Sequence, residues 1–272
     1  MTPFAEPVHA GPAPTASLRQ RLAARERLLS TFVKTTSHQT VEVLAATGLD
    51  TLVLDAEHAP FGPESLDRSL LAGHACGLPV LVRVPYPRAA AIQQALDLGA
   101  AGVMVPHVDD ARIATEVVRA ARYGQGGTRG FSTASRAGGY GLRSMADHLR
   151  ASDEHTAVIV QIESAQAVAE AAAIAAVPGV DCLFVGPADL AVSFGATGTD
   201  DPRVAEAMAT VCAAGRAAGR AVGCFVPDAR AVPDLGAMGA SFFVVGSDQA
   251  LLRKAARQVM AGAAESEAAC AP

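Results

Sequence analysis

The sequence has 272 residues, of which 50 % are hydrophobic and 18 % are charged, and its formal net charge is −5. A chain of this length can form one α/β barrel or two smaller domains, and its acidic balance argues against general nucleic-acid binding. The five cysteines show no C-x-x-C spacing, so neither a disulfide scaffold nor a zinc ribbon is expected. No stretch reaches the roughly 18 uninterrupted apolar residues of a membrane span. We therefore expect a cytoplasmic protein that binds neither nucleic acid nor membrane.

Residues 1–16 are rich in Pro, Ala and Gly, and we predict that they form a disordered tail. This segment has no basic region followed by an apolar one, so it does not read as a secretory signal. Ser17 can cap a short helix that runs to about Leu28. The folded domain is expected to span residues 17–272.

Short apolar runs alternate with alanine-rich helical segments along the rest of the chain. The runs are rich in Val, Ile, Leu and Phe without strict alternation, which is typical of strands buried on both faces of a parallel sheet. We predict strands at residues 29–34, 50–55, 79–84, 101–106, 157–162, 182–186, 221–226 and 241–246. Predicted helices occupy residues 38–47, 63–76, 89–98, 111–123, 165–176, 202–218, 228–236 and 248–264. Eight such repeats favour a single (β/α)8 (TIM) barrel, and an open doubly wound α/β sheet with fewer strands is the alternative.

One connection interrupts this rhythm between the fourth and fifth strands. Residues 124–141 read GQGGTRGFSTASRAGGYG and precede a short predicted helix near residues 144–151. The loop follows a helix and lacks the spacing of known phosphate-binding loops, so phosphate cradling is disfavoured. Arg129 and Arg136 remain candidates to meet an anionic substrate, because long ordered loops in compact domains are usually functional.

Polar residues gather where the predicted strands end, which is the catalytic face of a parallel barrel. Burying such groups without partners is costly, so we regard them as candidate site residues. They are Asp55, Glu57 and His58 after the second strand, Arg83 in the third, Gln161 and Glu163 in and after the fifth, and Asp189 after the sixth.

Glu163 and Asp189 follow adjacent strands and have no cluster of Cys or His beside them. Two carboxylates of this kind predict a site for a hard divalent ion, Mg²⁺ or Mn²⁺, completed by water and substrate oxygens. Co²⁺ is also compatible with the site. The alternative is structural, with each carboxylate capping a helix or pairing with an arginine.

Asp55 and His58 have a spacing compatible with an acid–base dyad, in which the carboxylate orients the imidazole. Arg83, carried inward by a barrel strand, is placed to stabilise a developing oxyanion. An Asp55–Arg83 ion pair is the structural alternative, and the two roles of Arg83 are compatible. Gln161 is a candidate to orient a water molecule or a ligand, with plain structural hydrogen bonding as the alternative. His107 follows the fourth strand and is a weaker candidate for the mouth of the site.

The segments LVLDAEHAPF, LVRVP, GVMVPHV, VQIES and LFVGPADLAVSFG occur in this order along the chain. Together they resemble the HpcH/HpaI family of class II, metal-dependent pyruvate aldolases, the family of 4-hydroxy-2-oxoheptanedioate aldolase. The resemblance covers roughly residues 28–258. It implies a TIM barrel that reversibly cleaves 4-hydroxy-2-oxo acids to pyruvate and an aldehyde through a metal-bound pyruvate enolate. It also implies a homohexamer in which the last helix, at residues 248–264, packs on a neighbouring barrel.

Carried onto this sequence, the resemblance makes Glu163 and Asp189 the metal ligands. It places Arg83 on the keto oxygen of pyruvate, and it makes His58, supported by Asp55, the acid–base group that acts through a metal-associated water. The pyruvate carboxylate would meet backbone amides at Gly186, Ala188 and Asp189.

Several features leave other activities open. The family often reads YPPxGxRG where this chain has YGQGGTRG at residues 123–130, so the resemblance does not specify the aldehyde half of the substrate. A class I aldolase would need a Schiff-base lysine, and of the two lysines, Lys34 closes a predicted strand whereas Lys254 lies on the last helix. The remaining alternatives are a malyl- or citramalyl-CoA lyase, an oxaloacetate decarboxylase, and a non-catalytic relative that binds an oxoacid.

Overall fold

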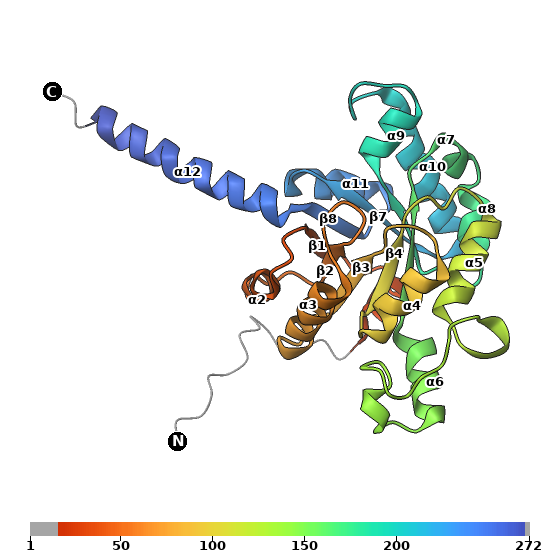
Figure 1. Ribbon diagram of the computed structural model, residues 1–272. Coiled ribbons are helices and arrows are strands. Elements are labelled where there is room, and N and C mark those ends of the chain that lie inside the picture. Colours follow the sequence, from red (N-terminus) through yellow and green to blue (C-terminus); the bar gives the residue numbers. More distant parts are fainter. Residues whose placement is uncertain (1–15, 270–272) are drawn as a thin grey trace, which may run out of the picture.

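The computed structural model describes residues 16–269, except for the side chains of Gln125 and of residues 264–269. Eight parallel strands follow one another around a closed barrel, and β8 pairs with β1 to complete it. This closure confirms the predicted (β/α)8 barrel and excludes the open sheet (Figure 1). The strands are β1 (Leu28–Val33), β2 (Leu52–Asp55), β3 (Val80–Arg83), β4 (Gly102–Val105), β5 (Ala157–Ile162), β6 (Cys182–Val185), β7 (Ala221–Val226) and β8 (Phe242–Ser247).

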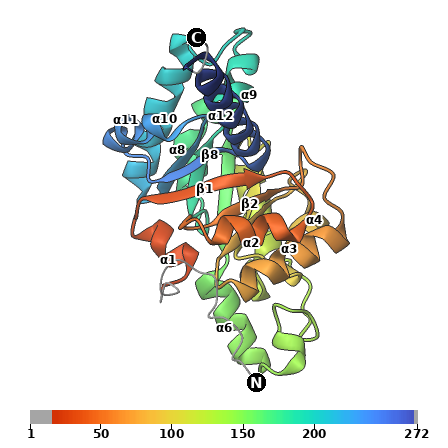
Figure 2. The ribbon, with the colours of Figure 1, turned by 90° about the vertical axis from the view of Figure 1, so that its left-hand side faces the viewer.

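Helices surround the barrel and cover its outer face (Figures 1 and 2). The first half contributes α1 (Leu18–Ala23), α2 (His38–Ala45), α3 (Pro63–Ala75), α4 (Ala89–Asp97), α5 (Ala111–Ala121) and α6 (Met145–His155). The second half contributes α7 (Ala165–Ala169), α8 (Ala171–Ala176), α9 (Pro187–Ser193), α10 (Pro202–Ala218), α11 (Val232–Met238) and α12 (Asp248–Ala269). Short 3₁₀ turns are η1 (Gly124–Gly126), η2 (Gly139–Gly141) and η3 (Ala229–Ala231).

The differences from the predicted elements have local causes. The helix expected at residues 17–28 ends at Ala23, because Arg25 has a φ of 54° and turns the chain into β1. The helix expected at residues 165–176 is broken at Glu170, whose ψ of 3° separates α7 from α8. Helix α9 was not predicted, although proline at its first position is a recognised helix-start signal. The predicted tail lies outside the described residues, apart from Ala16.

The alternation of side chains along each strand divides the core into two layers. Inward positions form one apolar cluster inside the barrel, and outward positions form a second cluster against the helices. Leu18 and Leu22 of α1 belong to the inner cluster and close the amino-terminal end of the barrel. The same period of two that carries Leu81 inward also carries Arg83 inward, and Ile159 is followed in the same way by Gln161. The fold therefore places polar groups at the carboxyl end of an apolar interior.

Helix α12 projects away from the barrel (Figures 1 and 2). Its Leu252, Val259 and Met260 are 73 %, 72 % and 70 % exposed. Within the described residues, no helix is both long enough and apolar enough to cross a membrane. The four cysteines that the structure describes are free thiols, as the sequence predicted.

Candidate active site

The carboxyl ends of the strands surround a hollow of about 510 Å³. Its apolar floor is formed by Phe32, Phe184 and Phe225 from β1, β6 and β7. Its polar lining consists mainly of Lys34, His58, Arg83, Gln161, Asp189, Ser247 and Arg253. The strand ends that the sequence singled out therefore meet around one cavity, in the position expected for the catalytic face of a barrel.

Arg83 is held from several sides beside this cavity. Its Nε and Nη2 donate to the two carboxylate oxygens of Asp55, at 2.9 and 2.7 Å. Register explains the pairing, since Asp55 and Arg83 are opposite one another on β2 and β3. The guanidinium also lies over the ring of Phe32, 4.2 Å from its centroid, and 3.3 Å from a carboxylate oxygen of Glu57. A side chain fixed in this way can present a permanent positive charge with little reorganisation.

Asp55 is fully buried, and its main interaction is the pair of hydrogen bonds that it accepts from Arg83. Burial would raise the pKa of Asp55, but the hydrogen bonds and charge of Arg83 outweigh it and lower that pKa. The carboxylate also accepts the backbone N–H of His58 at 3.1 Å and lies 3.2 Å from Lys34 Nζ. Asp55 thus contacts the backbone amide of His58 rather than its imidazole, because the guanidinium of Arg83 and the ammonium of Lys34 take up the carboxylate oxygens. The geometry therefore shows the Asp55–Arg83 ion pair, which was the structural alternative to an acid–base dyad.

The imidazole of His58 is exposed at the mouth of the cavity. Its pKa is lowered, first by partial burial and then by the charge of Arg83. A lowered pKa keeps the ring neutral near neutral pH, which is the form that can accept a proton.

Glu163 is buried directly after β5, and neighbouring residues orient its carboxylate. The backbone N–H of His107 donates to Oε1 at 2.7 Å, and Gln161 Nε2 donates to Oε2 at 2.6 Å. Burial raises the pKa of Glu163, and the nearby charge of Asp189 adds to this effect. Gln161 therefore makes the structural hydrogen bond that the sequence left as its alternative role, and this bond orients the carboxylate of Glu163.

Glu163 and Asp189 converge on the space left by a glycine. A Cβ at Gly186 would lie 3.4 Å from Asp189 Oδ2 and 3.5 Å from Glu163 Oε2. Two carboxylate oxygens facing one small space are suitable donors for a hard divalent ion. Among the described residues there is no group of three or more His, Cys, Asp or Glu that could hold a metal ion. The two carboxylates are therefore not part of a larger cluster of metal-ligating side chains in the described part of the chain.

The amides proposed to hold a carboxylate are not equivalent in the structure. The N–H of Gly186 donates to the carbonyl of Ile162 at 3.3 Å. Ala188 and Asp189 lie in the first turn of α9, where amides have no intrahelical acceptor, and Gly186 supplies no side-chain cap. These two residues are therefore the better donors.

Two residues at the site received no firm role from the sequence, namely Glu57 and His107. His107 Nδ1 lies 3.0 Å from Glu163 Oε1, and its Nε2 lies 3.4 Å from Glu57 Oε1. Burial raises the pKa of Glu57 to about 7, and the charge of Glu163 contributes to the rise. His107 has a φ of 57°, a strained conformation for a residue other than glycine. The strand-end position of each residue was a usable signal, whereas the backbone strain was not visible in the sequence.

The glycine-rich connection does not reach this cavity. Arg129 pairs with Asp97 at 2.6 Å and Arg136 pairs with Asp67 at 2.8 Å, both on helices near the amino-terminal end of the barrel. The two arginines that the sequence offered for an anionic substrate are therefore not among the residues that line this cavity.

The fold is a parallel eight-stranded barrel, and the cavity at its carboxyl end holds carboxylates, an arginine and a histidine. This arrangement is typical of barrel enzymes. A family model described as HpcH/HpaI aldolase/citrate lyase matches residues 28–255. The chain belongs to this family, as the sequence motifs indicated.

Named relatives extend over nearly the whole chain. A hydroxypyruvate/pyruvate aldolase of Paraburkholderia phytofirmans is 37 % identical over 253 residues, covering 90 % of this chain and 96 % of that protein. A 4-hydroxy-2-oxovalerate aldolase of Rhodococcus jostii is 38 % identical over 245 residues, covering 89 % and 93 %. A crystal structure of an HpcH/HpaI aldolase/citrate lyase family protein from Burkholderia cenocepacia has a TM-score of 0.86 and 39 % identity, covering 90 % of this chain and 98 % of that one.

Proposed function

We propose that this protein is a divalent-metal-dependent aldolase that reversibly cleaves 4-hydroxy-2-oxo acids to pyruvate and an aldehyde. The observation that carries the proposal is the convergence of Glu163 Oε2 and Asp189 Oδ2 on the space beside Gly186. The aldolase names of relatives that cover nearly the whole chain support the same reaction class.

Glu163 and Asp189 would hold the ion, Mg²⁺ or Mn²⁺, with Co²⁺ as a further candidate. When bound, it supplies Lewis-acid polarisation of the 2-oxo group. Arg83 contributes a fixed positive charge for the negative charge that develops on the 2-oxo oxygen. The amides of Ala188 and Asp189 would bind the carboxylate of the oxoacid.

His58 takes the proton from the C4 hydroxyl, directly or through a water molecule. The C3–C4 bond then breaks, its electron pair forms the pyruvate enolate, and the aldehyde leaves. The proton held by His58 is then returned to C3 of the enolate, which gives pyruvate and restores the neutral imidazole. The neutral form of His58 favoured by its lowered pKa suits the first of these transfers.

Chelation and borohydride reduction separate this mechanism from Schiff-base catalysis. EDTA is expected to abolish pyruvate release from 4-hydroxy-2-oxo acids, and Mg²⁺ or Mn²⁺ to restore it. Borohydride in the presence of pyruvate should leave the mass of the protein unchanged. Lys34 makes an ion pair with Asp55 at 3.2 Å, unlike the isolated lysine in an apolar pocket that iminium chemistry uses.

Trapped pyruvate on Lys34, or full activity in EDTA, would contradict the proposal. Oxaloacetate belongs in the same substrate panel, because its decarboxylation also ends in a pyruvate enolate. Faster turnover of oxaloacetate than of every hydroxy-oxoacid would favour decarboxylation as the function.

We further propose that α12 packs on another copy of the chain in a homohexamer. Leu252, Val259 and Met260 recur at helical spacing on its exposed surface, and their exposure is unfavourable in an isolated chain. Replacing both Val259 and Met260 by glutamate should shift the mass measured by analytical ultracentrifugation to a smaller species. The control is Gln258→Glu on the same helix, and an unchanged mass in the double variant would reject the interface.

A further inference from the structure

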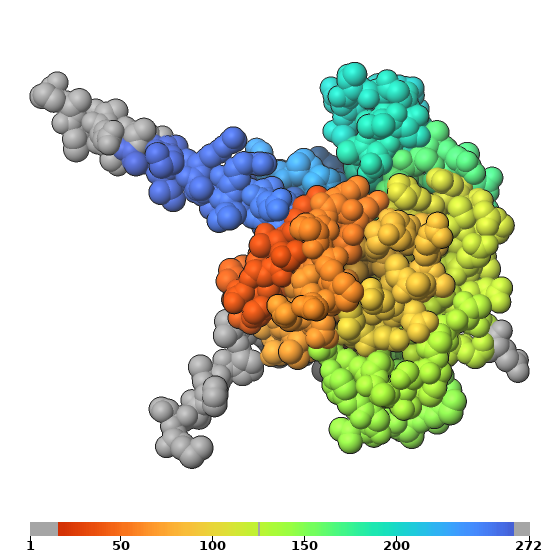
Figure 3. All heavy atoms as spheres, viewed as in Figure 1, coloured from red at the N-terminus to blue at the C-terminus, as the bar shows by residue number. Residues whose placement is uncertain are grey.

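The glycine- and arginine-rich connection folds beneath the barrel, at the end opposite α9 (Figures 1 and 2). In Figure 3 it forms part of the yellow-green lobe below the barrel. Two of its arginines anchor it to the barrel helices. Arg129, buried to 7 % exposure, pairs with Asp97 of α4, and Arg136 donates to the carbonyl of Leu98 at 2.8 Å and pairs with Asp67 of α3. These contacts create a second built surface, remote from the candidate active site.

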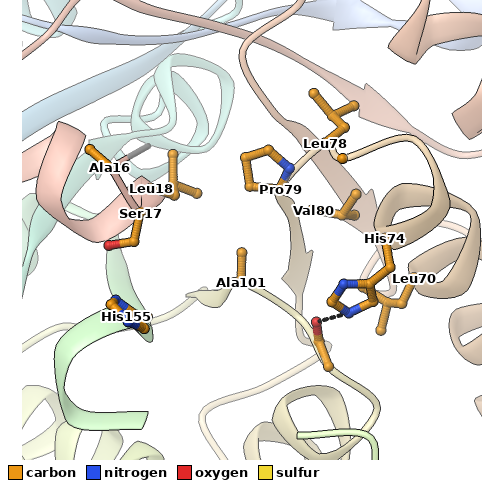
Figure 4. A pocket seen from close by; sticks show the side chains of 12 residues that line it. Ala16, Ser17, Leu18, Leu70, His74, Leu78, Pro79, Val80, Ala101 and His155 are labelled. Carbon is orange, nitrogen blue, oxygen red and sulfur yellow. Dashed lines mark hydrogen bonds between the residues drawn. The ribbon is translucent and has the colours of Figure 1, made fainter. Parts of the chain in front are cut away.

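Between this connection and the barrel lies a hollow of about 240 Å³. None of its lining residues is acidic. Its charged and titratable lining consists of Arg129, Arg136, Arg143, His74, His148 and His155. A neighbouring hollow of about 310 Å³ shares His74, Gly99, Ala101 and His155 with it. The hydrogen bond there between His74 Nε2 and the Gly99 carbonyl, at 3.0 Å, is the dashed line that starts from His74 in Figure 4.

The ion pairs of Arg129 and Arg136 that anchor the loop at residues 124–141 do not neutralise all the positive charge around the hollow. Arg143 contacts the Ala137 carbonyl at 3.4 Å, and among the described residues no carboxylate lies within ion-pair distance of it. Nε of the buried Arg129 has no hydrogen-bond partner within the described structure. Buried donors without partners are costly, and this one belongs to a side chain that lines the hollow.

The histidines experience the same positive charge. Burial lowers the pKa of His74, and the charges of Arg136 and Arg143 lower it further. Burial likewise lowers the pKa of His148, with Arg129 as the next cause. A cationic hollow of this kind, partly shielded from water, attracts anions more strongly than the same groups would on an open surface.

We propose that this hollow binds a compact anion with two or more negative charges, of the phosphate or polycarboxylate type. Guanidinium groups bind the oxygens of either type in a fork, and Ser152 adds a hydroxyl in the lining. The volume exceeds that of a single phosphate group, so a small metabolite carrying such a group also fits. This site goes beyond the proposed aldolase function and does not depend on it.

Isothermal titration calorimetry of the full chain tests the site with inorganic phosphate, pyrophosphate and citrate as separate probes. At least one probe is expected to bind, and Arg143→Ala should weaken its binding by about tenfold or more, the loss typical of one charge-assisted contact. The matched control is Arg150→Ala on α6, since Arg150 is exposed, pairs with Asp147 and is absent from the lining. The preferred probe identifies the phosphate or the carboxylate source.

The probes must also be distinguished from ligands of the candidate active site. Binding at the hollow should persist with excess pyruvate, and the KM of Arg143→Ala for the oxoacid should stay unchanged. Displacement by pyruvate, equal affinity of the Arg143→Ala and Arg150→Ala variants, or no heat with any probe would overturn the proposal. Thermal melting of both variants checks that the exposed substitutions leave the fold intact.

Discussion

Replacing Glu163 by glutamine is expected to reduce the aldolase activity by about 10³-fold or more, because the proposed metal ion would lose one of its two charged protein donors. The same substitution should leave the metal-free protein equally stable or more stable. Burial raises the pKa of Glu163, which means that its charged form is unfavourable in the fold. Glutamine removes that charge and retains an oxygen for the N–H of His107. Its amide N–H₂ replaces the oxygen that accepts from Gln161, and the Gln161 amide can turn over to present its unpartnered Oε1.

The sign of the pH dependence follows from the raised pKa. The charged carboxylate of Glu163 lowers the free energy of unfolding. This destabilisation is absent below the pKa of Glu163 in the unfolded chain and is complete above its pKa in the folded protein. The stability advantage of Glu163→Gln should therefore appear on raising the pH and vanish in acid. Urea unfolding with EDTA present measures it, and pyruvate release with added Mg²⁺ measures the activity.

Glu170→Gln is the matched control for this experiment, since Glu170 is exposed and lies in the same strand–helix unit. An active Glu163→Gln enzyme would remove the metal assignment. If Glu163→Gln greatly lowers the free energy of unfolding of the metal-free protein, the carboxylate instead stabilises the fold.

Replacing Arg83 by lysine is expected to lower kcat by about 10²–10³-fold, although the positive charge is retained. Lysine cannot reproduce the two parallel contacts to Asp55 at 2.9 and 2.7 Å, and its ammonium would not be fixed above Phe32. Steady-state kinetics of retro-aldol cleavage measures the loss. Arg88→Lys is the control, because Arg88 is exposed in the loop after β3. Near-normal kcat in Arg83→Lys would show that charge alone, without the fixed geometry, is sufficient.

Asp55→Asn probes the other half of this ion pair through stability. Arg83 would keep only its 3.3 Å ionic contact with Glu57 and lose both hydrogen bonds to a buried charge, which should cost about 3–5 kcal/mol in the free energy of unfolding at neutral pH. The pKa of Asp55 is lowered in the fold by Arg83, against the opposing effect of burial. Its contribution is therefore present above the unfolded pKa and disappears as the pH falls through the folded pKa. Urea unfolding should show the difference from wild type at neutral pH and its disappearance in acid, whereas a pH-independent difference would assign the loss to packing.

The barrel was predictable because its information is local and repeated. Each continuous apolar run is short, and glycine commonly separates it from the preceding helix, so all eight strands could be placed within two residues at each end. The proximity of Glu163 and Asp189 could also be predicted from the sequence, since parallel topology brings adjacent strand ends together.

Side-chain partners were less predictable because they depend on register and rotamer. Asp55 lies opposite Arg83 through the β2–β3 register, and that contact places the carboxylate on the backbone amide of His58. The positive φ of His107, which brings its amide and ring onto Glu163, has no signature in a sequence where glycine is the usual marker. The destination of the loop at residues 124–141 depended on its long-range contacts with α3 and α4.

Glycine is usually required where the backbone has a positive φ, and this reason does not apply to Gly186. Its φ of −100° is available to any residue, and an alanine Cβ would meet its neighbours at 3.3 Å or more. The backbone would therefore accept a methyl group, but that group would press on the Glu163 Cβ at 3.3 Å and would lie 3.4 and 3.5 Å from the two carboxylate oxygens. Under the proposed function, glycine at this position keeps open the space that a ligand would occupy, whereas its backbone conformation does not require glycine. Under the same proposal, one methyl group at this position could remove the chemistry of a relative while its barrel still folds.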